Sequence, residues 1–288
     1  MCRLFGLHAG SRPVRATFWL LDAPDSLSVQ SRREPDGAGI GTFAPDGSPK
    51  VTKRPLAAWE DHAFARDARV LRSTTFLAHV RYASTGALTV TNTHPFEQDG
   101  RLFAHNGAFS GLAALDGRLR SLEVMDLVQG QTDSERFFAL ITAEVRCNGG
   151  DVTAGIARAV SWIAAELPVF SLNFILTTAT DVWALRYPAT HGLYMLRRDP
   201  VAPAPAAPLD ARSKRIHSRS TELAGSPHVI FATEPMDHNP GWRPLESGEL
   251  VHVGPALTVA STFPFPDAPA HQLTLADLDP AAAESQRP

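Results

Sequence analysis

The feature that most constrains the fold is a pair of helical stretches between two strand-rich regions. Apolar residues recur every three to four positions in residues 133–145, for example at Phe137, Leu140 and Ile141, and the same spacing returns in residues 151–167. Each stretch therefore has one apolar face that must be covered. Strands, then helices, then strands predict an α+β fold in which helices cover sheets.

Short apolar runs bounded by Gly, Pro, Asp or Asn supply the expected strands. Before the helices they are "AGIGTF", "TTFLAHV" and "RLFAHNG". After the helices, "SLNFILTTATDVWALRY" predicts two strands around a polar turn, and "HVIFATEP", "ELVHV" and "PALTV" predict later strands.

With 288 residues, the chain can bury a large core. We expect one domain over residues 1–260. Residues 199–227 are rich in Pro, Ala and charge and lack aromatic residues, so they predict a mobile loop within it. Residues 261–288 predict a loosely ordered C-terminal tail.

The composition excludes several classes of function. A net charge of −3 gives no strong field for nucleic acid or an anionic membrane. No apolar run approaches the length of a membrane span or a secretory signal, so we expect a cytoplasmic protein. The two cysteines fit neither a disulfide framework nor a metal motif. His79, His94 and His105 form no recognisable metal set, so we expect no metal and no cofactor.

Cys2 has two interpretations. It can be a small buried thiol, or a nucleophile that acts once Met1 has been removed. In the second case the thiol and a free α-amine belong to one residue, and moving a proton between them costs only about 1 kcal/mol. The amine can then serve as the base that makes the thiolate.

The segment "LFAHNGAFSG" offers a partner for such a thiolate. Acyl transfer builds negative charge on the carbonyl oxygen, and fixed donors stabilise that charge. Asn106 supplies a side-chain amide and Gly107 an unhindered backbone N–H. The same dipeptide is also a common hairpin turn, so the motif alone leaves both interpretations open.

Two further motifs carry opposite charges. Arg81 ends an apolar run, and if it faces inward its guanidinium suits a carboxylate, with Ser84 on the same wall. By alternation alone an outward direction is equally compatible. Asp133 follows Thr132, which with Glu135 fits a helix capping box, and its carboxylate suits an ammonium group. Together Arg81 and Asp133 would bind a free α-amino acid.

In this order, the motifs resemble the class II glutamine amidotransferases of the N-terminal nucleophile hydrolases. The resemblance rests on Met-Cys, "EPDGAG", "HVRYAS", "NTHPF", "HNG" and "TDSE", over residues 1 to about 140. It implies a four-layer αββα sandwich. It further implies that Cys2 is nucleophile and base, that Asn106 and Gly107 form the oxyanion hole, and that Arg81 and Asp133 hold the substrate's α-carboxylate and α-ammonium. His94 would have a structural role.

The expected function is a cysteine-dependent amidohydrolase that releases glutamate from glutamine or a γ-glutamyl amide. The ammonia would be released to water or passed to a separate synthetase subunit. Two alternatives remain: a γ-glutamyl hydrolase of one small-molecule pathway, as in ergothioneine synthesis, or a non-catalytic module that binds amino acids. A third, an N-terminal-cysteine hydrolase of penicillin or bile-salt amides, fits less well because such enzymes lack the HNG and TDSE pairing.

Overall fold

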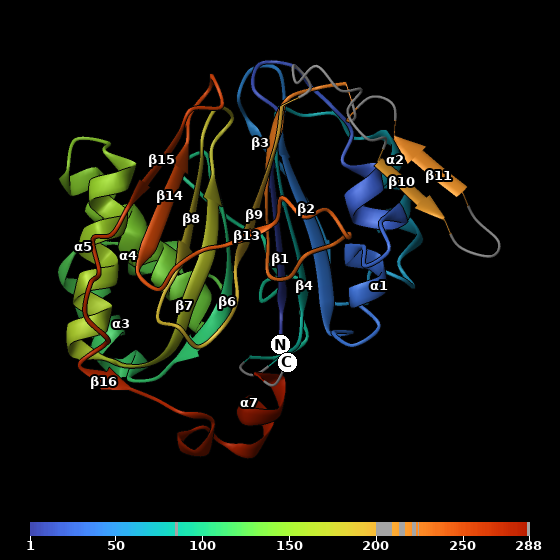
Figure 1. Cartoon of the computed structure of the whole chain (residues 1–288). Coiled ribbons are helices and arrows are strands. Elements are labelled where there is room, and N and C mark those ends of the chain that lie inside the picture. Colours follow the sequence, from blue (N-terminus) through green and yellow to red (C-terminus); the bar gives the residue numbers. More distant parts are fainter. Residues whose placement is uncertain (84–85, 200–208, 213–216, 221–222, 224, 287–288) are drawn as a thin grey trace.

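Two antiparallel sheets stacked face to face form the centre of the molecule in a computed structural model (Figure 1). The structure describes residues 1–83, 86–199, 209–212, 217–220, 223 and 225–286. Helices cover the outer face of each sheet, so the order of layers is helix, sheet, sheet, helix. The predicted four-layer αββα sandwich is confirmed.

The first sheet has the N-terminal strand near its middle. Strand β1 pairs antiparallel with β12 on one side and with β4 on the other. Its order is β13 (Arg243–Pro244), β9 (Tyr194–Arg198), β12 (His228–Ala232), β1 (Arg3–His8), β4 (Thr75–Arg81), β2 (Gly37–Phe43) and β3 (Pro49–Arg54).

The second sheet is built mainly from the middle of the chain. Its longest strand pair, β6 with β7, places Asn106 opposite Asn173. Its order is β15 (Val259–Thr262), β14 (Glu249–Val253), β8 (Val182–Arg186), β7 (Pro168–Thr177), β6 (Arg101–Phe109) and β5 (Phe96–Gln98), and β16 (His271–Gln272) runs parallel to β7.

Helices α4 (Asp133–Cys147) and α5 (Val152–Glu166) confirm the two predicted helical stretches. With α3 (Leu112–Ser121) they cover the second sheet, and they bury apolar side chains such as Phe137 against it. The first sheet is covered by η1 (Phe18–Asp22), α1 (Leu27–Gln30) and α2 (His62–Val70). A short turn, η2 (Met125–Leu127), precedes α4.

Alternation along the strands decides which residues lie between the sheets. Side chains two apart on a strand share a face. Leu4, Leu77 and Leu102 belong to the core between the two sheets, whereas Phe5 belongs to the core under the helices. Counting in twos from these leucines places Cys2, Arg81 and Asn106 on the inner face, toward one end of the sandwich.

Two segments differ from what the sequence predicts or lie partly outside the described residues. The expected strand at 255–259 is wrong for its first four residues, because a turn closes from Leu257 N–H to Gly254 C=O (2.9 Å) and β15 begins at Val259. Most of the predicted loop at 199–227 lies outside the described residues. The backbone of its described part pairs as β10 (Leu209–Arg212) with β11 (His217–Ser220).

The last segment runs under the sandwich to η3 (Leu275–Asp277) and α7 (Pro280–Ser285), and α7 lies near the N-terminus (Figure 1). The domain boundary at residue 260 and the loose order of the tail remain predictions. Among the described residues, no helix combines the length and the apolar character needed to cross a membrane.

Candidate active site

Cys2 lies just before β1, and its side chain contacts the residue that follows β4. The sulfur accepts a hydrogen bond from Tyr82 N–H (3.3 Å) and lies 3.4 Å from the Tyr82 carbonyl oxygen. Burial raises the pKa of the Cys2 thiol, and this effect outweighs the hydrogen bond from Tyr82 and the positive charges of the N-terminus and Arg81, which favour the thiolate. The thiol therefore needs a base close by.

A small cavity, here called the thiol cavity, brings most of the predicted residues together. Its lining includes Cys2, Arg81, Gly107 and Asp133, with His94 and His105 beside them. Its volume is about 20 Å³, which is room for roughly one water molecule. A ligand larger than one water can enter only if the walls separate.

Asn106 and Gly107 stand at the middle of β6. Asn106 is fully buried, and neither its Nδ2 nor its Oδ1 has a hydrogen-bond partner among the described residues. Leaving a buried amide unpaired costs about 1–3 kcal/mol, so such a group suits a ligand atom. Gly107 has no room for a side chain, since a Cβ would lie 2.0 Å from the Ser171 carbonyl oxygen.

Arg81 faces inward, which settles the direction that alternation left open. Its side chain is only 3% exposed, and its guanidinium donates to the Ala87 carbonyl (3.3 Å). Asp133, the first residue of α4, is 4% exposed and its charge acts on Arg81. Ser84, expected on the same wall, lies outside the described residues.

The predicted capping box at the start of α4 is half formed. Thr132 Oγ1 accepts from Glu135 N–H (3.2 Å), as expected of an N-cap. The Glu135 carboxylate, however, accepts from Gly130 N–H instead of reaching back to Thr132 N–H. The predicted bond from Thr132 N–H to the Glu135 carboxylate is therefore wrong, because the turn before the helix offers a nearer donor.

The residues around Asp133 form a network that the sequence did not indicate. His105 Nε2 lies 3.2 Å from the Ser171 carbonyl, which can only accept, so Nε2 carries the proton. Burial lowers the pKa of His105, so the ring is neutral and its Nδ1 accepts from Ser134 Oγ (3.0 Å). Ser134 N–H in turn donates to Asp133 Oδ1 (2.8 Å), which orients that carboxylate.

His94 packs in the wall of the thiol cavity. Its ring centroid lies 4.2 Å from that of His79 and 4.5 Å from that of Phe96. Burial lowers the pKa of His79 to about 3 and that of His94 well below its ordinary value. Both rings are therefore neutral packing groups at pH 7. The described residues contain no cluster of His, Cys, Asp and Glu suited to a metal ion.

Sequence reasoning also missed the ion pairs around the N-terminus. The Met1 amino group lies 3.5 Å from Glu34 Oε1, and Arg3 Nη1 lies 3.2 Å from the same oxygen. Arg3 Nη1 also donates to the Met1 carbonyl (2.6 Å). Glu34 stands two residues before the "DGAG" turn, so its position beside a motif was the one available indication.

Comparison with known proteins assigns this chain to a family. The family model described as "Glutamine amidotransferases class-II" matches residues 1–271 of this chain. The chain therefore belongs to the class II glutamine amidotransferases, a family of enzymes.

Particular relatives differ in the activity that their names state. The chain is 32% identical over 159 residues to the probable glutamine amidotransferase DUG3 of Saccharomyces cerevisiae, covering 49% of this chain and 44% of that protein. It is 27% identical over 264 residues to the gamma-glutamyl-hercynylcysteine sulfoxide hydrolase of Mycobacterium tuberculosis (strain H37Rv), covering 88% and 93%. A solved glutamine aminotransferase class-II domain protein from Silicibacter pomeroyi shares the fold, with a TM-score of 0.60 and 21% identity, covering 91% of this chain and 99% of that one.

Proposed function

We propose that this protein is a cysteine-dependent amidohydrolase that releases glutamate from glutamine or another γ-glutamyl amide. The observation that carries the proposal is the lining of the thiol cavity, where Cys2, Gly107, Arg81 and Asp133 meet. A thiol, an oxyanion donor, a cation and an anion in one cavity are what hydrolysis of a γ-amide of a free amino acid requires.

The reaction begins when Cys2 is the N-terminal residue. Its α-amine takes the thiol proton, and the sulfur attacks the γ-carbonyl carbon. Asn106 Nδ2 and Gly107 N–H stabilise the tetrahedral oxyanion. The amine then gives the proton to the leaving nitrogen as the C–N bond breaks. Water attacks the thioester, the C–S bond breaks, and glutamate leaves.

The two charged groups orient the substrate. Arg81 binds the α-carboxylate and Asp133 binds the α-ammonium, and this fixes the γ-carbonyl against the sulfur. His105 and Ser134 hold Asp133 in position, and His94 supports the wall. Ser84 is assigned to the same wall by its motif.

Two fates of the nitrogen are compatible with the family. Either ammonia passes to a separate acceptor enzyme, or hydrolysis of the γ-glutamyl amide is the whole reaction. The likeness to the mycobacterial gamma-glutamyl-hercynylcysteine sulfoxide hydrolase, over most of both chains, favours hydrolysis without ammonia transfer. A non-catalytic module is the remaining alternative, and a retained Met1 would favour it.

The test uses the two cysteines of the chain. We expect Cys2→Ala to reduce glutamate release from γ-glutamyl amides by at least about 10³-fold, because the nucleophile is lost. Cys147→Ala, at an exposed cysteine, is the matched control and should keep full activity. Mass spectrometry should find Met1 absent from the active protein. Substantial hydrolysis by folded Cys2→Ala protein would refute the proposal.

A further inference from the structure

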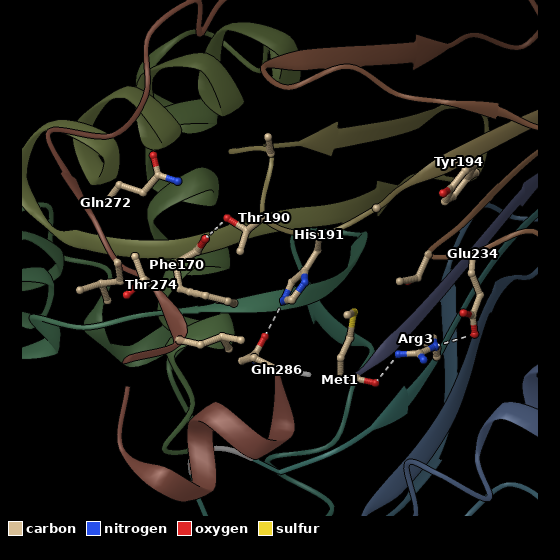
Figure 2. A pocket seen from close by; sticks show the side chains of 15 residues that line it. Met1, Arg3, Phe170, Thr190, His191, Tyr194, Glu234, Gln272, Thr274 and Gln286 are labelled. Carbon is tan, nitrogen blue, oxygen red and sulfur yellow. Dashed lines mark hydrogen bonds and ion pairs between the residues drawn. The ribbon is translucent and has the colours of Figure 1, made fainter. Parts of the chain in front are cut away.

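A second and much larger cavity lies on the other side of the N-terminal residue. Its volume is about 620 Å³, within the range of cavities that bind small molecules. Its lining includes Met1, Arg3, His191 and Glu234. Figure 2 shows the Met1 side chain pointing into the space toward His191. We call it the tail cavity.

One wall comes from a segment beyond the family-wide match. The match ends at residue 271, and residues 272–275 together with Gln286 line the tail cavity. His191 Nε2 lies 2.8 Å from Gln286 Oε1, and both side chains are buried (Figure 2). Buried side chains in contact with each other therefore form this wall.

The segment that forms this wall also contacts the second sheet. Gln272 pairs with Val169 of β7, and Leu273 N–H donates to the Val169 carbonyl (2.8 Å). Tyr187 Oη donates to the Asp267 carbonyl (3.0 Å). These contacts hold the wall in place against the second sheet.

The lining combines apolar surface with balanced charges. Phe170, Leu273 and Leu275 supply apolar surface. Arg3 and Glu234 both line the cavity, with Arg3 Nε 2.8 Å from Glu234 Oε1. Arg33 Nη2 lies 3.2 Å from the same carboxylate oxygen. The cavity therefore suits a ligand with an apolar body.

We propose that the tail cavity binds the amine half of a γ-glutamyl amide whose leaving amine is larger than ammonia and has an apolar body. The inference rests on the proposed function. Met1 joins the two cavities through its bond to Cys2. Once Met1 is removed, the space it fills adjoins the Cys2 amine. The glutamyl group then lies in the thiol cavity and the leaving amine in the tail cavity. Ammonia alone would leave the tail cavity unused.

Two substrates test this with the processed full-length enzyme: glutamine and γ-glutamyl-phenethylamide. We expect kcat/KM for the phenethylamide to exceed that for glutamine by about 30-fold or more, since burying an aromatic side chain contributes about 1.5–3 kcal/mol.

Substitutions in the lining of the tail cavity test whether the preference for the phenethylamide arises there. Ala189 is exposed and lines the tail cavity, so Ala189→Trp should lower the phenethylamide-to-glutamine ratio of kcat/KM about tenfold by filling the space. Ala113→Trp, at an exposed alanine on α3, is the matched control and should leave the ratio unchanged. Gln286→Leu removes the bond to His191 and should lower the ratio without adding bulk.

The outcomes separate the two proposals. Cys2-dependent hydrolysis that favours glutamine, or an unchanged ratio in both Ala189→Trp and Gln286→Leu, overturns the leaving-group site and leaves the proposed function standing. Absence of Cys2-dependent glutamate release from both substrates overturns both proposals.

Discussion

The thiol cavity and the tail cavity lie on either side of the N-terminal residue, and they are built in opposite ways. The first is about 20 Å³, and buried charged and polar groups line it. The second is about 620 Å³, and loops and a segment beyond the family match form much of its wall. Under the two proposals, the shared domain binds the fixed glutamyl part of the substrate and additions to it bind the variable amine part.

The sharpest test of this division of the substrate between the two cavities is Asp133→Asn. The change removes a buried charge that faces the substrate ammonium in the proposed mechanism, so kcat/KM should fall by about 10²–10³-fold. The loss should be the same for every γ-glutamyl substrate, because all share the glutamyl group. Asp126→Asn, at an exposed acid just before α4, is the control and should have no effect. A loss confined to bulky amides would break the division.

Asn106→Ala is expected to have the next largest effect. Removing one oxyanion donor costs about 10²–10³-fold in kcat. Because the ground-state carbonyl needs that donor less than the oxyanion does, KM should change little. Steady-state kinetics with glutamine checks this. An increase in KM at constant kcat would instead place Asn106 in ground-state binding.

The structure predicts a smaller effect on stability at the tail cavity. Burial lowers the pKa of His191 to about 4 from an ordinary 6.5. The unfolded chain then binds a proton that the folded chain rejects, so stability falls as pH falls from about 6.5 toward 4. By pH 5 the loss is about 2 kcal/mol from this residue.

Urea unfolding at pH 7 and pH 5 measures that loss. In His191→Gln the difference between the two pH values should shrink by about 2 kcal/mol. In His62→Gln, at an exposed histidine, it should remain as in the parent protein. An unchanged difference in His191→Gln would show that the ring is not held neutral by the tail wall.

The sequence predicts much of the shared domain because its information is local. Periodicity located α4 and α5, and ordered motifs located the residues of the thiol cavity. Strand order could not be read in this way, since β1 pairs with β12, more than 220 residues away (Phe5 with Ala232). Helix α2 was missed although Asp61 caps it, because it is short and most of its apolar residues are alanines.

The tail cavity was missed for a different reason. Its lining comes from separate stretches that share no motif, and the segment at 272–275 reads as an undifferentiated tail. Arg3 and Glu34 illustrate the same limit: each is an ordinary charged residue until the fold places them 3.2 Å apart beside Met1. Only packing between distant parts of the chain gives them a role.

The position of β1 between β12 and β4 also bears on fluctuations near the native state. A strand hydrogen-bonded on both sides cannot fray from an edge, so its amides exchange with solvent only through openings that approach complete unfolding. Cys2 immediately precedes such a strand. The sulfur is thus tied to the part of the chain that opens least.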